Sequence, residues 1–243
     1  HRAAHIGAFV VVQAALGHGA VDDVGSALYQ TALIGKWHLK RQPAGFDHFN
    51  VFHDQGEYVN PIFKTAENWV DDDKGKQGTE VKGFSTDIVA DQTMEWIRNR
   101  DKDKPFMMCC HFKATHEPWD FPERMKHLYD DVVFPEPESM MEFGPEESGR
   151  AFKGQQLENM GWRWETASKD PDAWWCRYPE LPFSTKGMDK VAARKKIYQK
   201  MIKDYLRCGA TIDDNIGRLL KMLDEEGLSQ NTIVVYVSDQ GYF

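Results

Sequence analysis

The chain has 243 residues, of which 41% are hydrophobic and 28% are charged, and this composition is ordinary for a folded globular domain. Its formal net charge of −8 argues against general binding to nucleic acid, although an acidic protein can still hold a locally cationic site. No apolar run approaches the roughly 20 residues that a membrane-spanning helix needs.

The first interpretable element is a strand that runs into a polar loop. Residues 1–28 are rich in glycine and alanine without a clear period, so they predict no element. Residues 29–34 predict a buried strand, and Lys36 and His38 follow it, two positions apart and therefore on the same side of an extended chain. An ammonium beside an imidazole can neutralise an oxyanion. The alternative is a surface lysine and a core histidine that flank Trp37.

The middle of the chain predicts loops, one helix and one strand. Residues 41–82 predict a loop region with short hairpin strands near the mouth of the proposed site. Residues 85–100 predict a helix that Ser85 or Asp87 caps. Residues 106–112 form a continuous apolar run, which is typical of a central strand.

Three histidines lie on or after this strand. His116 follows it and precedes Pro118, which stiffens the loop, so its imidazole is suited to hydrogen-bond a leaving oxygen. His111 is expected on the strand and His127 on an amphipathic helix. We therefore expect structural roles for these two.

The last third of the chain ends in a candidate metal-binding pair. Residues 136–182 are irregular and predict an insertion over the core, whereas residues 189–226 predict a long helix. The strongest strand signal, residues 232–237, leads to Asp239 and Gln240. A carboxylate and an amide oxygen suit calcium, which takes oxygen ligands with loose geometry. The alternative is an ordinary strand-ending turn.

Cysteines and paired aspartates have simpler interpretations. Cys109 and Cys110 are adjacent on a predicted strand, so they are expected on opposite faces as buried thiols rather than in a disulfide. Asp213 and Asp214 diverge by about 100° on a helix, which indicates a solvated face rather than a metal site.

The polar groups that follow predicted strands are Lys36 with His38, His116, and Asp239 with Gln240. In open α/β sheets, ligands collect beyond the carboxyl ends of the strands. The sequence therefore predicts one site that combines metal ligands, a fixed cation and two imidazoles.

Several segments also resemble a known family. The segment YQTALIGKWHL (29–39) closely resembles the second signature of the sulfatases, which belong to the alkaline phosphatase superfamily. The segment KATHEPW (113–119) is similar to the active-site histidine loop of that family. Residues 205–218 and VSDQG (237–241) are similar to its helix and its metal-binding strand. The order and spacing of these motifs agree with the family from residue 29 to the end of the chain.

The resemblance implies a fold and a set of roles. The fold would be an α/β, alkaline-phosphatase-like, mostly parallel sheet with helices on both faces, and the chain would be an internal, incomplete part of one catalytic domain. Lys36 and His38 would hold the sulfate oxygens. His116 would contact the sulfate or protonate the departing sugar oxygen, while Asp239 and Gln240 would bind calcium.

The resemblance also implies a substrate class. Gln240 departs from the Asn or His of many sulfatases and resembles a subgroup acting on glycans, including 6-sulfated N-acetylglucosamine, and residues 55–61 look like the same subgroup. The implied activity is hydrolysis of sulfuric esters on sulfated sugars or glycosaminoglycans, with a periplasmic or extracellular location by family analogy. The alternatives are a phosphodiesterase or phosphonate hydrolase of the superfamily, or an inert fragment or glycan-binding relative.

Two family features are absent from the sequence. Sulfatases carry an early Asp-Asp metal pair and a Cys- or Ser-x-Pro-x-Arg motif, whose first residue becomes the formylglycine nucleophile, and no such motif occurs here. The basic residue that the family has beyond its metal strand is also missing, because the chain stops at Phe243. We therefore expect formylglycine in the complete protein, and we expect this chain alone to be inactive.

Overall fold

The computed structural model describes residues 7–13, 29–70, 77–141, 156–172 and 177–238. The chain divides into two compact units, which are described separately. The first unit comprises His1–His116 and Ala210–Phe243, and the second comprises Glu117–Gly209. Within the described residues, no helix combines the length and the apolar character needed to cross a membrane.

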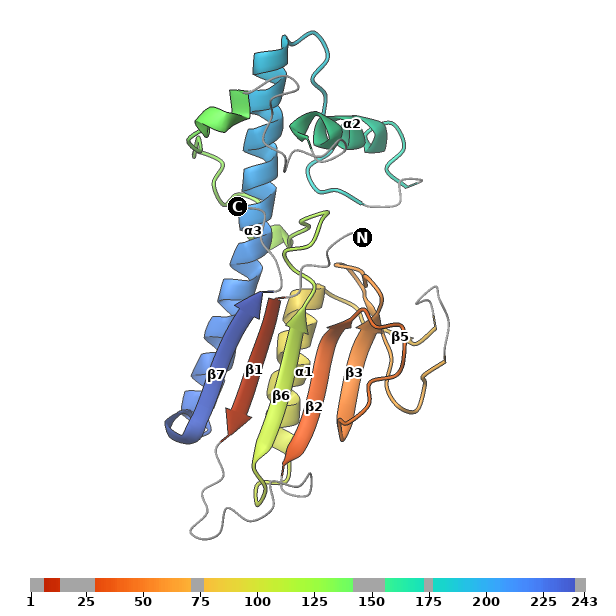
Figure 1. The fold of residues 1–243 in the computed structure, drawn as a ribbon, viewed down its shortest axis with the longest axis vertical. Helices are drawn as coiled ribbons and strands as arrows, with labels where there is room; N and C mark the ends of the chain where they lie inside the picture. Colours follow the sequence, from red (N-terminus) through yellow and green to blue (C-terminus); the bar gives the residue numbers. More distant parts are fainter. Residues whose placement is uncertain (1–6, 14–28, 71–76, 142–155, 173–176, 239–243) are drawn as a thin grey trace. The chain divides into compact units, whose positions relative to one another are not determined.

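A five-stranded sheet with the order β3-β2-β6-β1-β7 forms the first unit (Figure 1). Its strands are β1 (Gly7–Gln13), β2 (Gln30–Trp37), β3 (His48–His53), β6 (Phe106–Phe112) and β7 (Thr232–Ser238). β2 pairs in parallel with β3 and β6, whereas β1 is antiparallel to β6 and β7. Four strands therefore run in one direction and end at one edge of the sheet, which we name the carboxyl edge. This arrangement confirms the predicted α/β class.

β2 and β6 carry buried side chains on both faces of the sheet, as expected for inner strands. One face of the sheet carries an apolar cluster of Leu33, Phe49, Val51 and Cys109. Cys110, next along β6, interacts with Thr93 on the other face, so the two cysteines point in opposite directions as predicted. Both thiols are free and buried, as is that of Cys208, while Cys176 lies outside the described residues.

Two helices of this unit pack on each other. α1 (Ser85–Asn99) contacts β6 and β2, and it lies behind the sheet in Figure 1. The C-terminal part of α3 (Lys190–Glu225) joins α1 through Asn215, whose Nδ2 donates to Asp87 Oδ1 at 2.7 Å. The predicted cap by Ser85 or Asp87 is wrong, because Phe84 is the N-cap residue and Asp87 is used for this contact with α3. A helix on the other face stays a prediction.

Two strands of the sheet were not predicted. β1 lies within residues 1–28, where composition gave no signal, and β3 lies within residues 41–82. The predicted hairpin is present as β4 (Ile62–Phe63) and β5 (Thr79–Glu80), which pair with each other. The chain also contains the 3₁₀ turn η3 (Ser229–Asn231) just before β7.

The second unit has its own small core around the N-terminal part of α3. Met140, Tyr198 and Ile202 form its buried apolar cluster. The interval 136–182, which was expected to be irregular, contains the helix α2 (Leu157–Ala167). Two 3₁₀ turns, η1 (Glu123–Met125) and η2 (Glu138–Met141), complete the unit.

Candidate anion-binding site

The end of β2 brings a lysine into the interior next to a close contact with the paired strand β6. The side chain of Lys36 is fully buried. Gly35 precedes it with φ +109°, and a Cβ atom there would lie 1.9 Å from the carbonyl oxygen of His111 on β6. Only glycine therefore fits this position. This close contact between the paired strands fixes the backbone that carries Lys36. The carbonyl oxygen of Lys36 itself lies 3.3 Å from His111 Nδ1.

The loop after β3 supplies partners for Lys36 and His38. Lys36 Nζ donates to Gln55 Oε1 at 3.1 Å. Nε2 of His38 lies 2.7 Å from Asp54 Oδ1 and 3.4 Å from Gln55 Nε2. β2 and β3 are parallel neighbours, so the residues that follow them meet at the carboxyl edge. The structure thus brings the two predicted residues together around one amide and one carboxylate.

The contact with Asp54 determines how His38 presents its ring. A carboxylate accepts hydrogen bonds, and at 2.7 Å it is the nearer neighbour of Nε2, so that nitrogen carries a proton. Nδ1 is then the ring nitrogen left to accept or donate a proton elsewhere. The pair is about one-third exposed, with 28% for His38 and 32% for Asp54, so it can reach a ligand from solvent.

The loop after β6 is tied to the same residues. Lys113 Nζ donates to the main-chain oxygen of Gln55 at 2.8 Å and lies 5.0 Å from the centre of the Tyr58 ring. The main-chain N–H of His116 donates to the oxygen of Lys113 at 3.1 Å, and Tyr58 Oη donates to the oxygen of His116 at 2.7 Å. His116 is therefore anchored through its backbone to the loop that holds Gln55.

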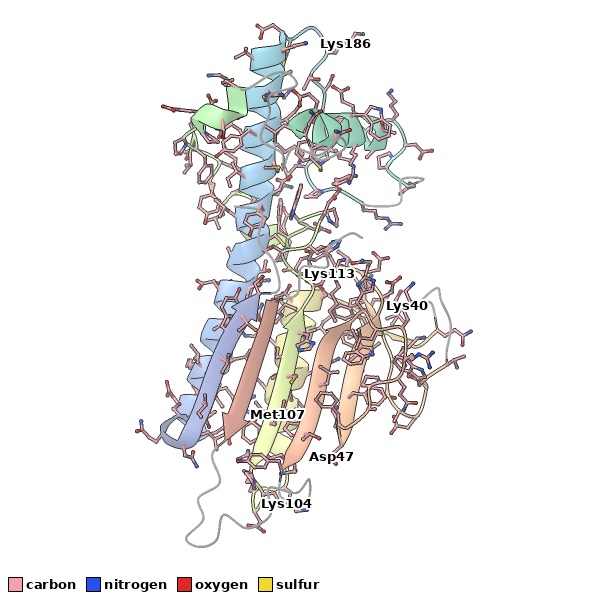
Figure 2. The ribbon with its side chains drawn as sticks, in the orientation of Figure 1. Lys40, Asp47, Lys104, Met107, Lys113 and Lys186 are labelled. Atoms are coloured by element: carbon pink, nitrogen blue, oxygen red, sulfur yellow. The ribbon has the colours of Figure 1, made fainter. Side chains whose placement is uncertain are left out.

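Figure 2 shows where these loops lie on the sheet. Lys113 is at the carboxyl edge, and Lys40 lies toward the same end. Asp47, Lys104 and Met107 are at the opposite end of the strands. Lys113, which bonds to Gln55, thus belongs to the edge where ligands collect in open α/β sheets.

The other two histidines have separate environments. Burial lowers the pKa of His111, an effect that its contact with the Lys36 carbonyl opposes, so this ring on β6 is neutral at neutral pH. His127 lies in an exposed turn rather than on the predicted helix, and its Nδ1 is 2.8 Å from Asp130 Oδ2. The structural role expected for His111 accords with its position within the strand.

The predicted calcium ligands, Asp239 and Gln240, lie outside the described residues. The last residue of β7, Ser238, is aligned with Gly7 of β1, which is in turn aligned with Phe112 at the end of β6. β7 therefore ends at the carboxyl edge. Across the described part of the chain, no group of three or more His, Cys, Asp or Glu side chains could hold a metal ion. The roles of Asp239 and Gln240 as calcium ligands stay predictions.

The thiols of Cys109 and Cys110 are poorly suited to act as nucleophiles. Burial raises the pKa of Cys110 to about 12 and also raises the pKa of Cys109. Both groups are protonated at neutral pH, and a thiol attacks only as its thiolate.

Comparison with known proteins identifies the family. The family model described as Sulfatase matches residues 24–242. This chain belongs to the sulfatase family. It is 35% identical to the N-acetylglucosamine-6-O-sulfatase of Bacteroides thetaiotaomicron over 88% of this chain and 42% of that protein. It is 26% identical to an arylsulfatase of Clostridium perfringens over 90% of this chain and 46% of that protein.

A solved structure agrees with this assignment. The sulfatase chain is similar to BT4656, solved in complex with its substrate D-glucosamine-2-N,6-O-disulfate, with a TM-score of 0.65 and 30% identity. The match covers 85% of the sulfatase chain and 46% of that protein. The chain thus spans less than half the length of these relatives.

Four described residues of the candidate site were not among the predicted site residues. They are Asp54, Gln55, Tyr58 and Lys113. The sequence signals were the resemblance of residues 55–61 to glycan sulfatases and the position of Lys113 within the histidine-loop motif. Neither signal indicates contact with Lys36 or His38, because that contact depends on β3, which was not predicted.

Proposed function

We propose that the sulfatase containing this chain hydrolyses sulfate esters on amino sugars of the glucosamine type. The observation that carries the proposal is the convergence of Lys36 and His38 on Gln55 at the carboxyl edge. A sulfate monoester is a compact anion, and a buried ammonium beside an imidazole is suited to hold its oxygens. The similarity to an N-acetylglucosamine-6-O-sulfatase and to a protein solved with a glucosamine disulfate supports the sugar class.

The chemistry assigned to this chain is positioning and charge stabilisation. Sulfuryl transfer, like phosphoryl transfer, spreads negative charge over nonbridging oxygens, so fixed cations lower its barrier. Lys36 would supply an ammonium group, and the Asp54 contact would keep the His38 ring in one orientation. A sugar alkoxide leaves poorly, so protonation of its oxygen by His116 would contribute about 10²–10⁴-fold.

The formylglycine nucleophile and the calcium ion that the resemblance implies are not assigned to the described residues. The printed sequence has no Cys- or Ser-x-Pro-x-Arg motif, and the described residues do not form a calcium site. We therefore derive no step through formylglycine or calcium. The steps that we assign to this chain are sulfate binding, sulfate orientation and proton transfer to the leaving oxygen.

Substrate comparison on the full-length protein tests the proposal. Sulfate release from N-acetylglucosamine 6-sulfate and hydrolysis of bis(4-nitrophenyl) phosphate would be measured side by side, with His127→Ala as a variant outside the site. We expect the sulfated sugar to be the better substrate and His127→Ala to match the wild type. Preference for the phosphodiester would reject the proposal and favour a phosphodiesterase.

A further inference from the structure

Gln55 receives an ammonium group on each of its two carbonyl oxygens. Lys36 Nζ donates to the side-chain oxygen at 3.1 Å, and Lys113 Nζ donates to the main-chain oxygen at 2.8 Å. Lys36 is fully buried, and Lys113 is 4% exposed. Lys36 lies near the end of β2 and Lys113 directly follows β6, so Gln55 adds a link between the ends of these two paired strands.

The partner of Lys36 at this point is an amide rather than a carboxylate. A glutamate at the same position would place a negative charge beside Lys36, and the net charge offered to an anion would fall by one. A neutral amide orients the ammonium with a hydrogen bond and adds no negative charge of its own. The amide is therefore suited to a site that must stay cationic.

We propose that Gln55 is a positioning residue that orients Lys36 without placing a negative charge beside it, and that Lys113 holds Gln55 in place. This inference rests on the proposed sulfatase function. Lys113 fixes the backbone of residue 55 through its side chain and fixes His116 through its carbonyl oxygen. The loop after β3, which supports Lys36 through Gln55, and the loop after β6, which carries His116, therefore share one anchor.

Tyr58 strengthens the connection between these loops. Its ring lies under Lys113 Nζ at 5.0 Å, and its hydroxyl donates to His116 at 2.7 Å. The ring is buried and stacks on Phe84, which precedes α1, at a centroid distance of 5.6 Å. The anchor is thus built on packed elements, which limits how far Gln55 can move.

Two substitutions at residue 55 separate positioning from packing. Gln55→Ala removes the amide, whereas Gln55→Glu keeps its size and adds a negative charge. We expect kcat/KM for N-acetylglucosamine 6-sulfate to fall about 10-fold in Gln55→Ala and about 100-fold in Gln55→Glu. The order of the two kcat/KM values decides between the two roles. If the side chain of Gln55 only filled space, glutamate would replace it better than alanine. Higher activity in Gln55→Glu than in Gln55→Ala would overturn the proposal.

Lys64 offers a matched control for Lys113. It is also buried, its Nζ donates to the main-chain oxygen of Val70 at 2.9 Å, and it lies 5.2 Å from the Trp69 ring. Lys113→Met is expected to lower kcat about 10- to 100-fold, whereas Lys64→Met keeps the kcat of the folded protein. Thermal unfolding of both variants would correct for stability. Equal loss of kcat in both variants at equal folded fraction would overturn the role of Lys113.

A measurement that needs no turnover distinguishes this inference from the proposed function. The ¹⁵N-labelled ammonium signal of Lys36, assigned with Lys36→Arg, reports its protection from exchange with water. We expect the signal to be lost in Gln55→Ala and Lys113→Met and kept in Lys64→Met. This pattern without sulfatase activity in the wild type would reject the function and retain the positioning role. An unchanged signal in Gln55→Ala would reject the positioning role, whatever the activity.

Discussion

The imidazole of His38 and the carboxylate of Asp54 lie 2.7 Å apart, although the first follows β2 and the second follows β3. Parallel pairing of these strands produces the contact, since it places the two following residues at one edge of the sheet. The same pairing brings Gln55 to Lys36. The groups that we propose to bind the anion are thus held by the ends of neighbouring strands.

Removing the charge of Asp54 tests whether it orients His38. Asp54→Asn is suitable because φ is +62° at this position and asparagine tolerates that conformation. We expect kcat for N-acetylglucosamine 6-sulfate to fall about 10- to 100-fold, because the His38 ring loses its charged partner. Asp91→Asn, at an exposed ion pair with Arg218, is the control. Wild-type kcat in Asp54→Asn would show that the contact has no role in turnover.

The close contact of β2 with β6 at Gly35 predicts that a single added methyl group costs much stability. Gly35→Ala combines a positive φ with a Cβ atom 1.9 Å from His111 O, so it should destabilise the protein by about 2–5 kcal/mol. Gly217→Ala is the matched control, because a Cβ on this helical glycine meets nothing within 4 Å and should stabilise by about 0.5–1 kcal/mol. Urea denaturation measures both. Similar unfolding midpoints for the two variants would contradict the close contact between Gly35 and His111.

The second unit should show a pH-dependent stability through Asp120. Burial raises the pKa of this carboxyl to about 6, although the Phe121 N–H, which donates to it at 2.8 Å, opposes the shift. A raised pKa means that the stability from this group is present below about pH 4 and is lost as pH rises through about 6.

Asp120→Asn removes this dependence while keeping an acceptor for Phe121. We expect the variant to unfold at the same denaturant concentration as the wild type at pH 4 and to be more stable by about 1–3 kcal/mol at pH 8. The exposed Asp131→Asn serves as the control. An advantage for Asp120→Asn at pH 4 that disappears at pH 8 would have the wrong sign for a buried carboxylate.

The elements with strong periodicity were predictable from the sequence. β2, β6, α1 and the long helix α3 agree with their apolar patterns within a few residues, and Asp213 and Asp214 are exposed on α3 as expected. β3 was missed because polar and aromatic residues surround a short strand. β1 was missed because residues 1–28 show no period that favours either a helix or a strand.

The site was predictable only in part, for a related reason. Lys36, His38 and His116 follow apolar runs, and motifs mark them. The roles of Asp54 and Gln55 depend on which strand lies beside β2, and this neighbour relation leaves no local pattern in the sequence. Lys113 lies within a predicted motif, yet its bond to Gln55 joins loops that are distant along the chain.

The central claim is that Lys36 stabilises the sulfate group during its transfer. The most direct test is the turnover of N-acetylglucosamine 6-sulfate by the full-length protein, compared between Lys36→Met and Lys40→Met. Lys40 is exposed and lies toward the same end of the sheet in Figure 2, so it controls for general loss of positive charge. We expect turnover to fall about 100- to 1000-fold in Lys36→Met and to stay at the wild-type value in Lys40→Met. Wild-type turnover in a folded Lys36→Met protein would contradict the account.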